Sequence, residues 1–247
     1  MKRPIDALEE RIRGKAEKRA KWRGKSISLR QFFQEVYCIP PEIYERIRGF
    51  ICRNFWPNGS VKEMVRFKGS FFHGIQREYH DNGLIKREVR WENGKRDGVT
   101  REWYKNGNLY FEGYWTMGKQ DGDWKYLYNS ESQDIMRHEH WDLGKKEGDV
   151  KIFYKNGVLK SKIPFLNGLE HGTSKYWNDD MMLTKESEWK CGKRHGISRL
   201  FNHTKGNVLV EIIWRNGKQR AIRRILDNGI VCTLSQHFSF CDYLDNL

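Results

Sequence analysis

The chain has 247 residues and a formal net charge of +14, and its 10 Trp, 11 Tyr and 13 Phe concentrate the apolar area in rings. Disordered chains are poor in aromatic residues, so this composition excludes a disordered protein. The five cysteines, without a C-x-x-C pair, argue against a disulfide framework and a zinc site and favour a reducing compartment. No apolar run has bilayer length and no signal-peptide-like segment is present, so we expect an intracellular, non-secreted protein without a transmembrane segment.

Residues 1–27 are predicted to form a basic, partly helical arm. Residues 1–30 contain 11 Lys or Arg and 4 Asp or Glu, so they carry +7, half of the net charge. Such an arm favours an anionic partner, which is a nucleic acid, an acidic protein or an anionic membrane surface. The arm residues expected to contact that partner are Lys15, Lys18, Arg19, Lys21, Arg23 and Lys25.

Residues 28–55 are predicted to form a helical cap. The capping-box pattern from Ser28 to Gln31 begins one helix, and Pro40-Pro41 ends it and can begin another. The segment IPPEIYERIRGFI at 39–51 resembles the first helix of an F-box, which implies a ubiquitin-ligase adaptor with a Skp1-like partner. The alternative is a cap that only shields the edge of the first strand.

Glycines mark a repeat over residues 56–230. Gly74, Gly98, Gly122, Gly148, Gly172 and Gly196 are spaced by 24 to 26 residues, and in three units a second glycine follows Asn, as in Asn82-Gly83. Asn-Gly between short strands predicts a hairpin with a type I′ turn, so each unit should be strand, Asn-Gly turn, strand and Gly-Lys turn. We therefore predict a mainly β fold, an elongated antiparallel meander of about seven 24-residue hairpin repeats, with a C-terminal cap at 231–247.

Two aromatic columns recur in register along the repeats. A single-layer meander has no second layer to make a thick core, so stacked rings should supply its buried area. The alternative is a platform on which a ligand stacks. The first, structural column is Phe67, Trp91, Trp115, Trp141, Phe165, Trp189 and Trp214. The second is Tyr79, Trp103, Leu127, Phe153, Trp177 and Phe201.

A basic residue occupies the third position after the first glycine of every unit. Glu88, Glu112, Glu186 and Glu211 on the partner strands could neutralise the resulting stripe. The stripe is therefore either a solvated face or a docking surface for an acidic protein, a nucleic-acid backbone or phosphoinositide headgroups. Its members are Arg77, Arg101, Lys125, Lys151, Lys175, Arg199 and Arg224.

The sequence offers no catalytic, cofactor-binding or metal site. GYWTMGKQ at 113–120 approaches a phosphate-binding loop, but Gln120 replaces the hydroxyl residue, and Gly-Lys recurs in other units as a turn. The column before the first glycines (His73, Asp97, Asp121, Glu147, His171, His195) recurs every two strands, roughly 10 Å apart, too far for a shared metal or proton. His138-x-His140 has no evident third ligand. We therefore expect a non-enzyme without a small-molecule substrate.

Units such as GVTREWYKNGNLYFEGYWTMGKQD at 98–121 resemble the MORN-repeat variant of bacterial and Marseillevirus-like large DNA virus proteins, over about residues 56–230. The resemblance implies a non-enzymatic scaffold for protein–protein interaction, with membrane or lipid association in some relatives. The viral likeness implies a virion or infection-associated structural component that binds capsid or other virion proteins, in the virion or host cytoplasm. Alternatives are the F-box-like adaptor, a sequence-independent nucleic-acid or anionic-lipid binder, and an immunity-type partner protein.

Overall fold

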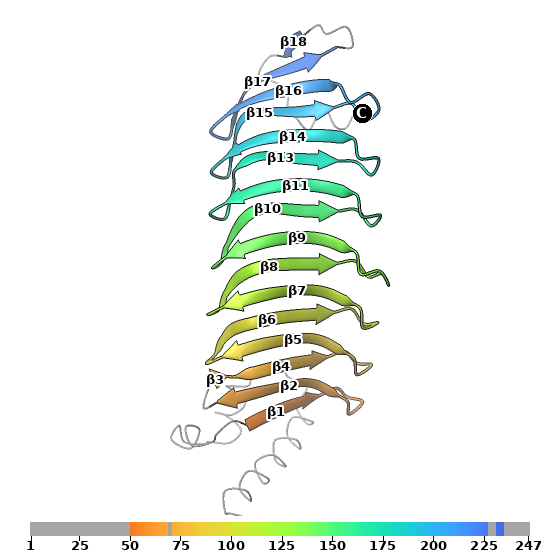
Figure 1. Cartoon of the computed structure of the whole chain (residues 1–247), viewed down its shortest axis with the longest axis vertical. Helices are drawn as coiled ribbons and strands as arrows, with labels where there is room; N and C mark the ends of the chain where they lie inside the picture. The colour runs from red at the N-terminus through yellow and green to blue at the C-terminus, as the bar shows by residue number, and fades with distance from the viewer. Residues whose placement is uncertain (1–49, 69–70, 227–230, 235–247) are drawn as a thin grey trace, which may run out of the picture. The chain divides into compact units, whose positions relative to one another are not determined.

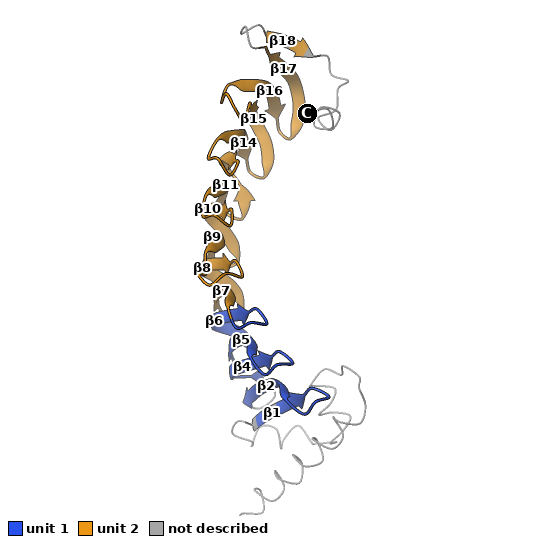
Figure 2. Cartoon of the chain, turned by 90° about the vertical axis from the view of Figure 1, so that its right-hand side faces the viewer, with its two compact units in different colours: residues 1–107 blue, residues 108–247 orange. Residues whose placement is uncertain are grey.

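A computed structural model describes residues 50–68, 71–226 and 231–234, which are strands joined by short turns (Figure 1). This described part contains no helix, and hence none long and apolar enough to cross a membrane. The chain divides into two compact units, residues 1–107 and 108–247 (Figure 2). The basic arm with its lysines and arginines, residues 28–49 of the expected cap and residues 235–247 lie outside the described residues.

Unit 1 is an antiparallel meander in which strands pair in chain order. Its strands are β1 (Phe50–Phe55), β2 (Val61–Lys68), β3 (Phe71–Phe72), β4 (Gly74–Tyr79), β5 (Ile85–Glu92) and β6 (Lys95–Trp103). Residues 50–55 were expected to end the helical cap, and that expectation is wrong. They form β1, because their backbone pairs along its whole length with β2, from Phe50 opposite Phe67 to Phe55 opposite Val61.

Unit 2 continues the same pattern, again with strands paired antiparallel in chain order. Its strands are β7 (Leu109–Thr116), β8 (Lys119–Leu127), β9 (Ile135–Asp142), β10 (Lys145–Phe153), β11 (Leu159–Leu166), β12 (Leu169–Glu170), β13 (Gly172–Trp177), β14 (Leu183–Lys190), β15 (Lys193–Phe201), β16 (Val208–Arg215), β17 (Lys218–Ile225) and β18 (Val231–Leu234). The predicted mainly β meander of hairpin repeats is confirmed in both units, and β18 adds a strand within the expected C-terminal cap.

The Asn-Gly pairs on which the hairpin prediction rests, Asn82-Gly83, Asn106-Gly107 and Asn156-Gly157, do not form type I′ turns, which corrects the expected turn geometry. Between β4 and β5 only Gly83 adopts a positive φ, of 85°, whereas Asn82 does not. The backbone N–H of Gly83 donates to the carbonyl of His80 at 3.0 Å, and Asn82 Oδ1 accepts from the N–H of Leu84 at 3.2 Å. Asn82 thus caps a five-residue loop with its side chain, and the glycine alone supplies the left-handed residue.

Two successive left-handed residues occur instead at the opposite ends of the hairpins. The first residue of each pair has φ between 43° and 53°, and its glycine between 75° and 93°, which is the type I′ signature. Each pair is a two-residue loop between two paired strands. The pairs are Asn93-Gly94, Met117-Gly118, Leu143-Gly144, Asn167-Gly168, Cys191-Gly192 and Asn216-Gly217. The phosphate-loop-like stretch at 113–120 therefore contains an ordinary hairpin turn.

The first glycine of a unit sits in a β-bulge. On β6, Thr100 lies opposite Val89 and Arg96 opposite Trp91, so residues 97–99 of β6 face the single residue Arg90 of β5. Gly98 lies in this bulge with φ of 99°, and a Cβ there would lie 2.7 Å from Cδ of Arg90. Both the left-handed backbone and the close side chain require glycine, so the bulge explains the period by which the repeat is recognised.

The core is a column of buried side chains on one face of the sheet, named the core face. In unit 1, Val65, Val89 and Thr100 are each at most 2% exposed. In unit 2 the column runs through Trp124, Glu139, Val150, Ser161, Ser174, Ser187, Ser198, Ile212 and Ile222. Small side chains predominate at these positions because a single sheet can close over only a thin layer.

Glu139 is a buried carboxylate in that column, with 1% of its surface exposed. Its oxygens accept hydrogen bonds from Trp141 Nε1 at 3.0 Å and from the guanidinium of Arg137, and Lys146 Nζ lies 3.3 Å away. A buried charge is tolerated only when it is paired and hydrogen-bonded, and these three donors meet that requirement. Glu139 therefore serves the packing of unit 2.

The aromatic column on the core face is joined through bridging side chains. Equivalent residues of successive units are two strands apart, roughly 9.6 Å, which exceeds the 4.5–7 Å of a ring contact. In unit 1 the ring of Phe72 lies 4.9 Å from that of Phe67 and 5.0 Å from that of Trp91. A side chain from the intervening strand is thus needed to connect two rings of the column.

In unit 2 the bridge is either another ring or a cation. Trp124 lies 5.3 Å from Trp115 and 6.3 Å from Trp141. Lys146 Nζ lies 5.2 Å from the ring of Trp141 and 5.3 Å from that of Phe165. Each cation–π contact of this kind contributes about 0.5–2 kcal/mol. The column in unit 2 is thus a stack of rings in which neighbouring members are joined by a further ring or by a cation. The guanidinium of Arg194 holds the corresponding place between Trp189 and Trp214.

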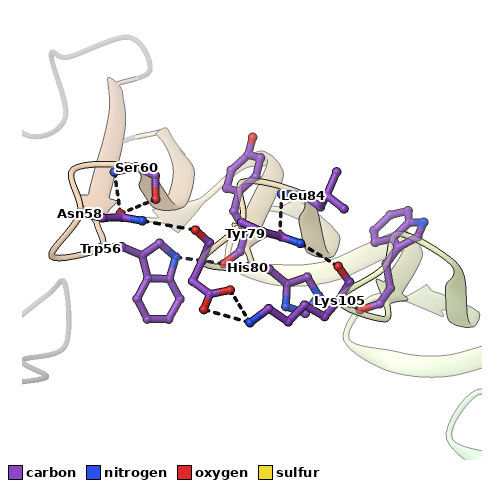
Figure 3. Close-up of polar contacts among 10 residues, drawn as sticks. Trp56, Asn58, Ser60, Tyr79, His80, Leu84 and Lys105 are labelled. Carbon is purple, nitrogen blue, oxygen red and sulfur yellow. Dashed lines mark hydrogen bonds and ion pairs between the residues drawn. The ribbon is translucent and has the colours of Figure 1, made fainter.

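Side chains at the end of one hairpin bond to the backbone of the next. In unit 1, Trp56 Nε1 donates to the carbonyl of Tyr79 at 3.3 Å, and His80 Nε2 donates to that of Trp103 at 3.0 Å (Figure 3). Both bonds span 23 residues, so they are equivalent steps of one ladder. In unit 2 the ladder continues with tyrosine hydroxyls, from Tyr128 to the carbonyl of Phe153 and from Tyr154 to that of Trp177.

The asparagines of the five-residue loops form a second ladder in unit 1. Asn58 Nδ2 donates to the carbonyl of Asp81 at 3.3 Å, and Asn82 Nδ2 to that of Lys105 at 2.8 Å (Figure 3). Lys105 Nζ also pairs with Asp81 at 2.8 Å and lowers the pKa of that carboxyl by hydrogen bonding. Asn before the loop glycine is thus explained by capping its own loop and tying it to the next.

Candidate interaction surface

The acidic and histidine column before the bulge glycines caps neighbouring turns. Asp121 accepts from the hydroxyl of Thr116 at 2.7 Å and from the N–H of Leu143 at 3.5 Å, and the Thr116 bond lowers the pKa of Asp121. Glu147 accepts from the N–H of Asn167 at 2.8 Å. These residues each satisfy the first residue of a type I′ turn in the following hairpin, which is a structural task.

Histidines at 138 and 140 share one carboxylate. His140 Nδ1 lies 2.9 Å and His138 Nε2 3.5 Å from Asp123 Oδ1, and the hydrogen bond to His140 is the main cause that lowers the pKa of Asp123. Across residues 50–68, 71–226 and 231–234, no three His, Cys, Asp or Glu side chains gather closely enough to hold a metal ion. The cluster can form ion pairs on the surface.

An open pocket of about 250 Å³ lies on unit 2 beside the end of β14. Its lining mixes imidazoles, a carboxylate and an ammonium, so it presents no surface of a single charge. The lining residues are His171, Gly172, Thr173, Glu188, Trp189, Lys190 and His195. Exposed Cys191 lies next to it, with its sulfur 4.0 Å from His171 Nδ1.

Two members of the predicted basic stripe are held in ion pairs. Arg77 Nε lies 2.8 Å from Glu88. Arg199 contacts Glu186 at 2.6 Å and Glu211 at 2.9 Å, and these hydrogen bonds, to Glu211 first, raise its pKa. Positive and negative side chains alternate from strand to strand at these places, so their charges are neutralised within the sheet. Arg101 lies directly opposite Glu88 in the same arrangement.

Arg224 does not belong to the stripe, which corrects its assignment. The register of β16 and β17 places Arg223 opposite Glu211, and Arg224 opposite Val210 of the core face. Because side chains alternate between faces along a strand, Arg224 lies on the opposite face from Arg199. The loop between β15 and β16 has one extra residue, but the bulge on β17 is one residue shorter than that on β6, so the two changes cancel and the residue 24 positions after Arg199 is Arg223. Allowing for the inserted loop residue alone gives Arg224.

The middle of unit 2 differs from both ends of the stripe. Lys125 lies opposite His138, His138 opposite Lys151, Lys151 opposite Lys162, and Lys162 opposite Lys175. These five side chains, named the basic run, come from β8, β9, β10, β11 and β13 and share one face. No carboxylate interrupts the run, and Glu112 and Glu186 flank its two ends.

The basic run is only partly neutralised. Lys162 Nζ lies 2.9 Å from Asp149, and His138 contacts Asp123, while Lys125 and Lys175 are exposed. Like charges directly opposite each other destabilise a sheet. Sequence reasoning missed Lys162 and His138, although both occupy the partner-strand position that Glu88, Glu112, Glu186 and Glu211 hold in other units. Comparing that position between units would have found them.

Taken together, the fold is a meander of β-hairpin repeats with glycine bulges, ladders between hairpins and one unbalanced basic surface. Residues 72–95, 96–116 and 146–167 match the family model of the MORN repeat variant, with matches in both units. These matches support a MORN-repeat protein, and MORN repeats are commonly non-catalytic modules that mediate protein or membrane interactions. No curated protein matches the chain.

Proposed function

We propose that this protein is a non-enzymatic repeat scaffold that binds an acidic partner protein through the basic run of unit 2. The observation that supports the proposal most directly is the uninterrupted register of five basic side chains on five adjacent strands. The same row of the sheet is elsewhere an alternating ion-pair ladder, as at Arg199. The basic run is thus a local departure from a pattern that stabilises the sheet.

The electrostatic argument rests on spacing. Adjacent strands are ~4.8 Å apart, which is less than the Debye length of about 8 Å at physiological ionic strength. Lys151, Lys162 and Lys175 lie on adjacent strands and therefore repel one another in the free protein. An anionic partner relieves that repulsion on binding, and complementary charge of this kind raises association rates and selects partners.

The viral setting and the F-box-like segment do not contribute to the proposal. Most of the segment at 39–51 lies outside the described residues, and no curated relative matches the chain. A structural role in a virion and a ubiquitin-ligase role stay predictions of the sequence resemblance. Virion proteomics would test the first, and a Skp1 pull-down with residues 28–55 the second.

Charge reversal within the run tests the proposal. The full-length Lys151→Glu/Lys175→Glu variant is compared with Lys119→Glu/Lys145→Glu, which makes the same charge change at exposed turn-flanking lysines. Binding of labelled poly-glutamate is followed by fluorescence anisotropy at 150 mM salt. We expect the run variant to lose at least tenfold in affinity and the control less than threefold, because the run concentrates charge locally.

Equal losses in the two variants would refute the proposal, because net charge alone would then explain binding. Duplex DNA and phosphatidylserine vesicles serve as parallel probes in the same assay. Tighter, run-dependent binding of either would assign the surface to a nucleic acid or a membrane, and would overturn the assignment to a protein partner.

A further inference from the structure

An apolar row accompanies the basic run on the same face of unit 2. Two residues beyond Lys125, Lys151 and Lys175 along their strands come Leu127, Phe153 and Trp177. Because side chains alternate along a strand, these residues share the face of the run. Their register partners on the next strands are also apolar. The resulting row is Leu127, Ile135, Phe153, Leu159, Trp177 and Leu183.

Most of this row remains in contact with solvent. Ile135 is 38% exposed, and Phe153, Leu159, Trp177 and Leu183 are partly exposed, whereas only Leu127, at 9%, is buried. The face therefore presents two parallel stripes that cross the strands, one basic and one apolar. Two residues along a strand separate the stripes by roughly 6.6 Å.

We propose that the occupant of this face is an amphipathic acidic α-helix of the partner protein, lying across the strands. The inference rests on the proposed function and specifies the element that binds. Its acidic stripe would pair with the basic run, and an adjoining apolar stripe would cover the apolar row. Charge complementarity and the spacing of the basic side chains both favour this occupant.

The spacing favours a helix over an extended peptide. Five strands place the basic side chains of the run about 4.8 Å apart, over roughly 19 Å in total. A helix rises 1.5 Å per residue, so acidic residues at i, i+4, i+7, i+11 and i+14 recur every ~5.3 Å and span about 21 Å. In an extended peptide, the side chains that face the sheet recur only every ~6.6 Å. Their spacing therefore exceeds that of the basic run, and after two or three residues they no longer lie over its side chains.

The apolar row selects an amphipathic helix among acidic helices. A helix is about 10 Å across with its side chains, so neighbouring stripes on its surface reach two rows about 6.6 Å apart. Burial of one aromatic or aliphatic side chain contributes more binding free energy than one exposed ion pair. The apolar contacts should therefore supply most of the affinity, and the charges the orientation.

Three synthetic 18-residue peptides test the inference against full-length protein. The first carries five Glu on one helical stripe and Leu on the adjoining stripe. The second has the same composition with Glu distributed around the helix, and the third is the first with a central Pro that breaks the helix. Titration calorimetry at 150 mM salt should show the first peptide binding at least tenfold more tightly than either of the others.

Two variants separate this inference from the proposed function. Lys151→Glu/Lys175→Glu should weaken the first peptide tenfold or more. Ile135→Glu changes an exposed side chain of the apolar row, so the fold should tolerate it, which circular dichroism verifies. It should weaken the first peptide at least fivefold and change poly-glutamate binding less than twofold relative to a Lys119→Gln control, which makes the same change of one charge.

The outcomes distinguish the two hypotheses. If all three peptides bind equally and depend on the basic run, the helix inference is wrong and the acidic-partner function stands. If the first peptide binds with unchanged affinity to the Ile135→Glu variant, the apolar row is not part of the surface and the inference fails. If neither the peptides nor poly-glutamate respond to the run variant, the proposed function itself fails.

Discussion

The packing of Gly113 against Trp124 gives a sharp test of the core. Trp124 on β8 is 4% exposed, and its indole lies so close to Gly113 on β7 that a Cβ there would be 2.4 Å from a ring carbon. One repeat earlier, Val89 and Thr100 hold the equivalent opposed positions. The two pairs fill a similar space differently. Gly113 has no side chain and Trp124 a large one, whereas Val89 is medium-sized and Thr100 small. The perturbation is therefore Gly113→Val, alone and combined with Trp124→Thr.

The expected magnitudes follow from these distances. In Gly113→Val the Cβ or the ring must move by about 1 Å to reach ordinary contact, and such overpacking costs about 1–3 kcal/mol. Trp124→Thr alone leaves a cavity beside the glycine and should cost about 3–5 kcal/mol. The double variant recreates the Val–Thr pair of unit 1, so its loss should be smaller than the sum of the single losses by about 1–3 kcal/mol.

Urea unfolding followed by far-UV circular dichroism measures the three free energies, and it avoids the fluorescence of the tryptophan that is removed. The m-values should stay constant, so that the changes refer to the same transition. Single losses that add to the double loss within about 0.5 kcal/mol would refute the reasoning, because independent sites behave additively.

Two further predictions concern the turns and pH. Leu143 is half-exposed and has φ of 43°, a conformation that Asn adopts more readily. Leu143→Asn should therefore raise the free energy of unfolding, measured in urea, by about 1 kcal/mol. A lower free energy of unfolding would contradict the type I′ assignment of this turn. Burial raises the pKa of Glu170 above its ordinary 4.5, against opposing attraction from Arg194, Lys146 and Lys185. Its contribution to stability is therefore largest below that value and declines as pH rises through the folded pKa. Glu170→Gln should thus gain stability relative to the parent at pH 7 compared with pH 4, and the same difference at both pH values would oppose this.

The repeat was predictable because its signal is local. The left-handed bulge residue and the loop residue both favour glycine, so the spacing of glycines alone reveals the period of the repeat. The turn types were not predictable in the same way. Loop length selects the turn, since Asn82-Gly83 lies in a five-residue loop and Asn93-Gly94 in a two-residue loop. The strand ends that define those lengths depend on pairing across the hairpin.

The surface was only partly predictable, for a related reason. Lys125, Lys151 and Lys175 follow from the 24-residue period, since each lies at the same position of its unit. Their neighbours Lys162 and His138 recur just as regularly on the return strands, but only the register shows that they lie between the three lysines. Register across the sheet, which is a pairwise property of two strands, decides which charges meet.

The side-chain ladders have a consequence for how such a chain can change in length. Each bond joins one hairpin only to the next, 23 or 25 residues onward, as from Trp56 to Tyr79 and from Tyr128 to Phe153. Duplication or loss of one complete hairpin within a unit leaves every remaining bond with a partner of the same kind. Extra residues within a loop need not break such a bond, since the bond from Tyr128 to Phe153 is kept across the longer loop between β8 and β9. Gene segments coding for one hairpin are therefore the natural increments by which this architecture can be extended or shortened.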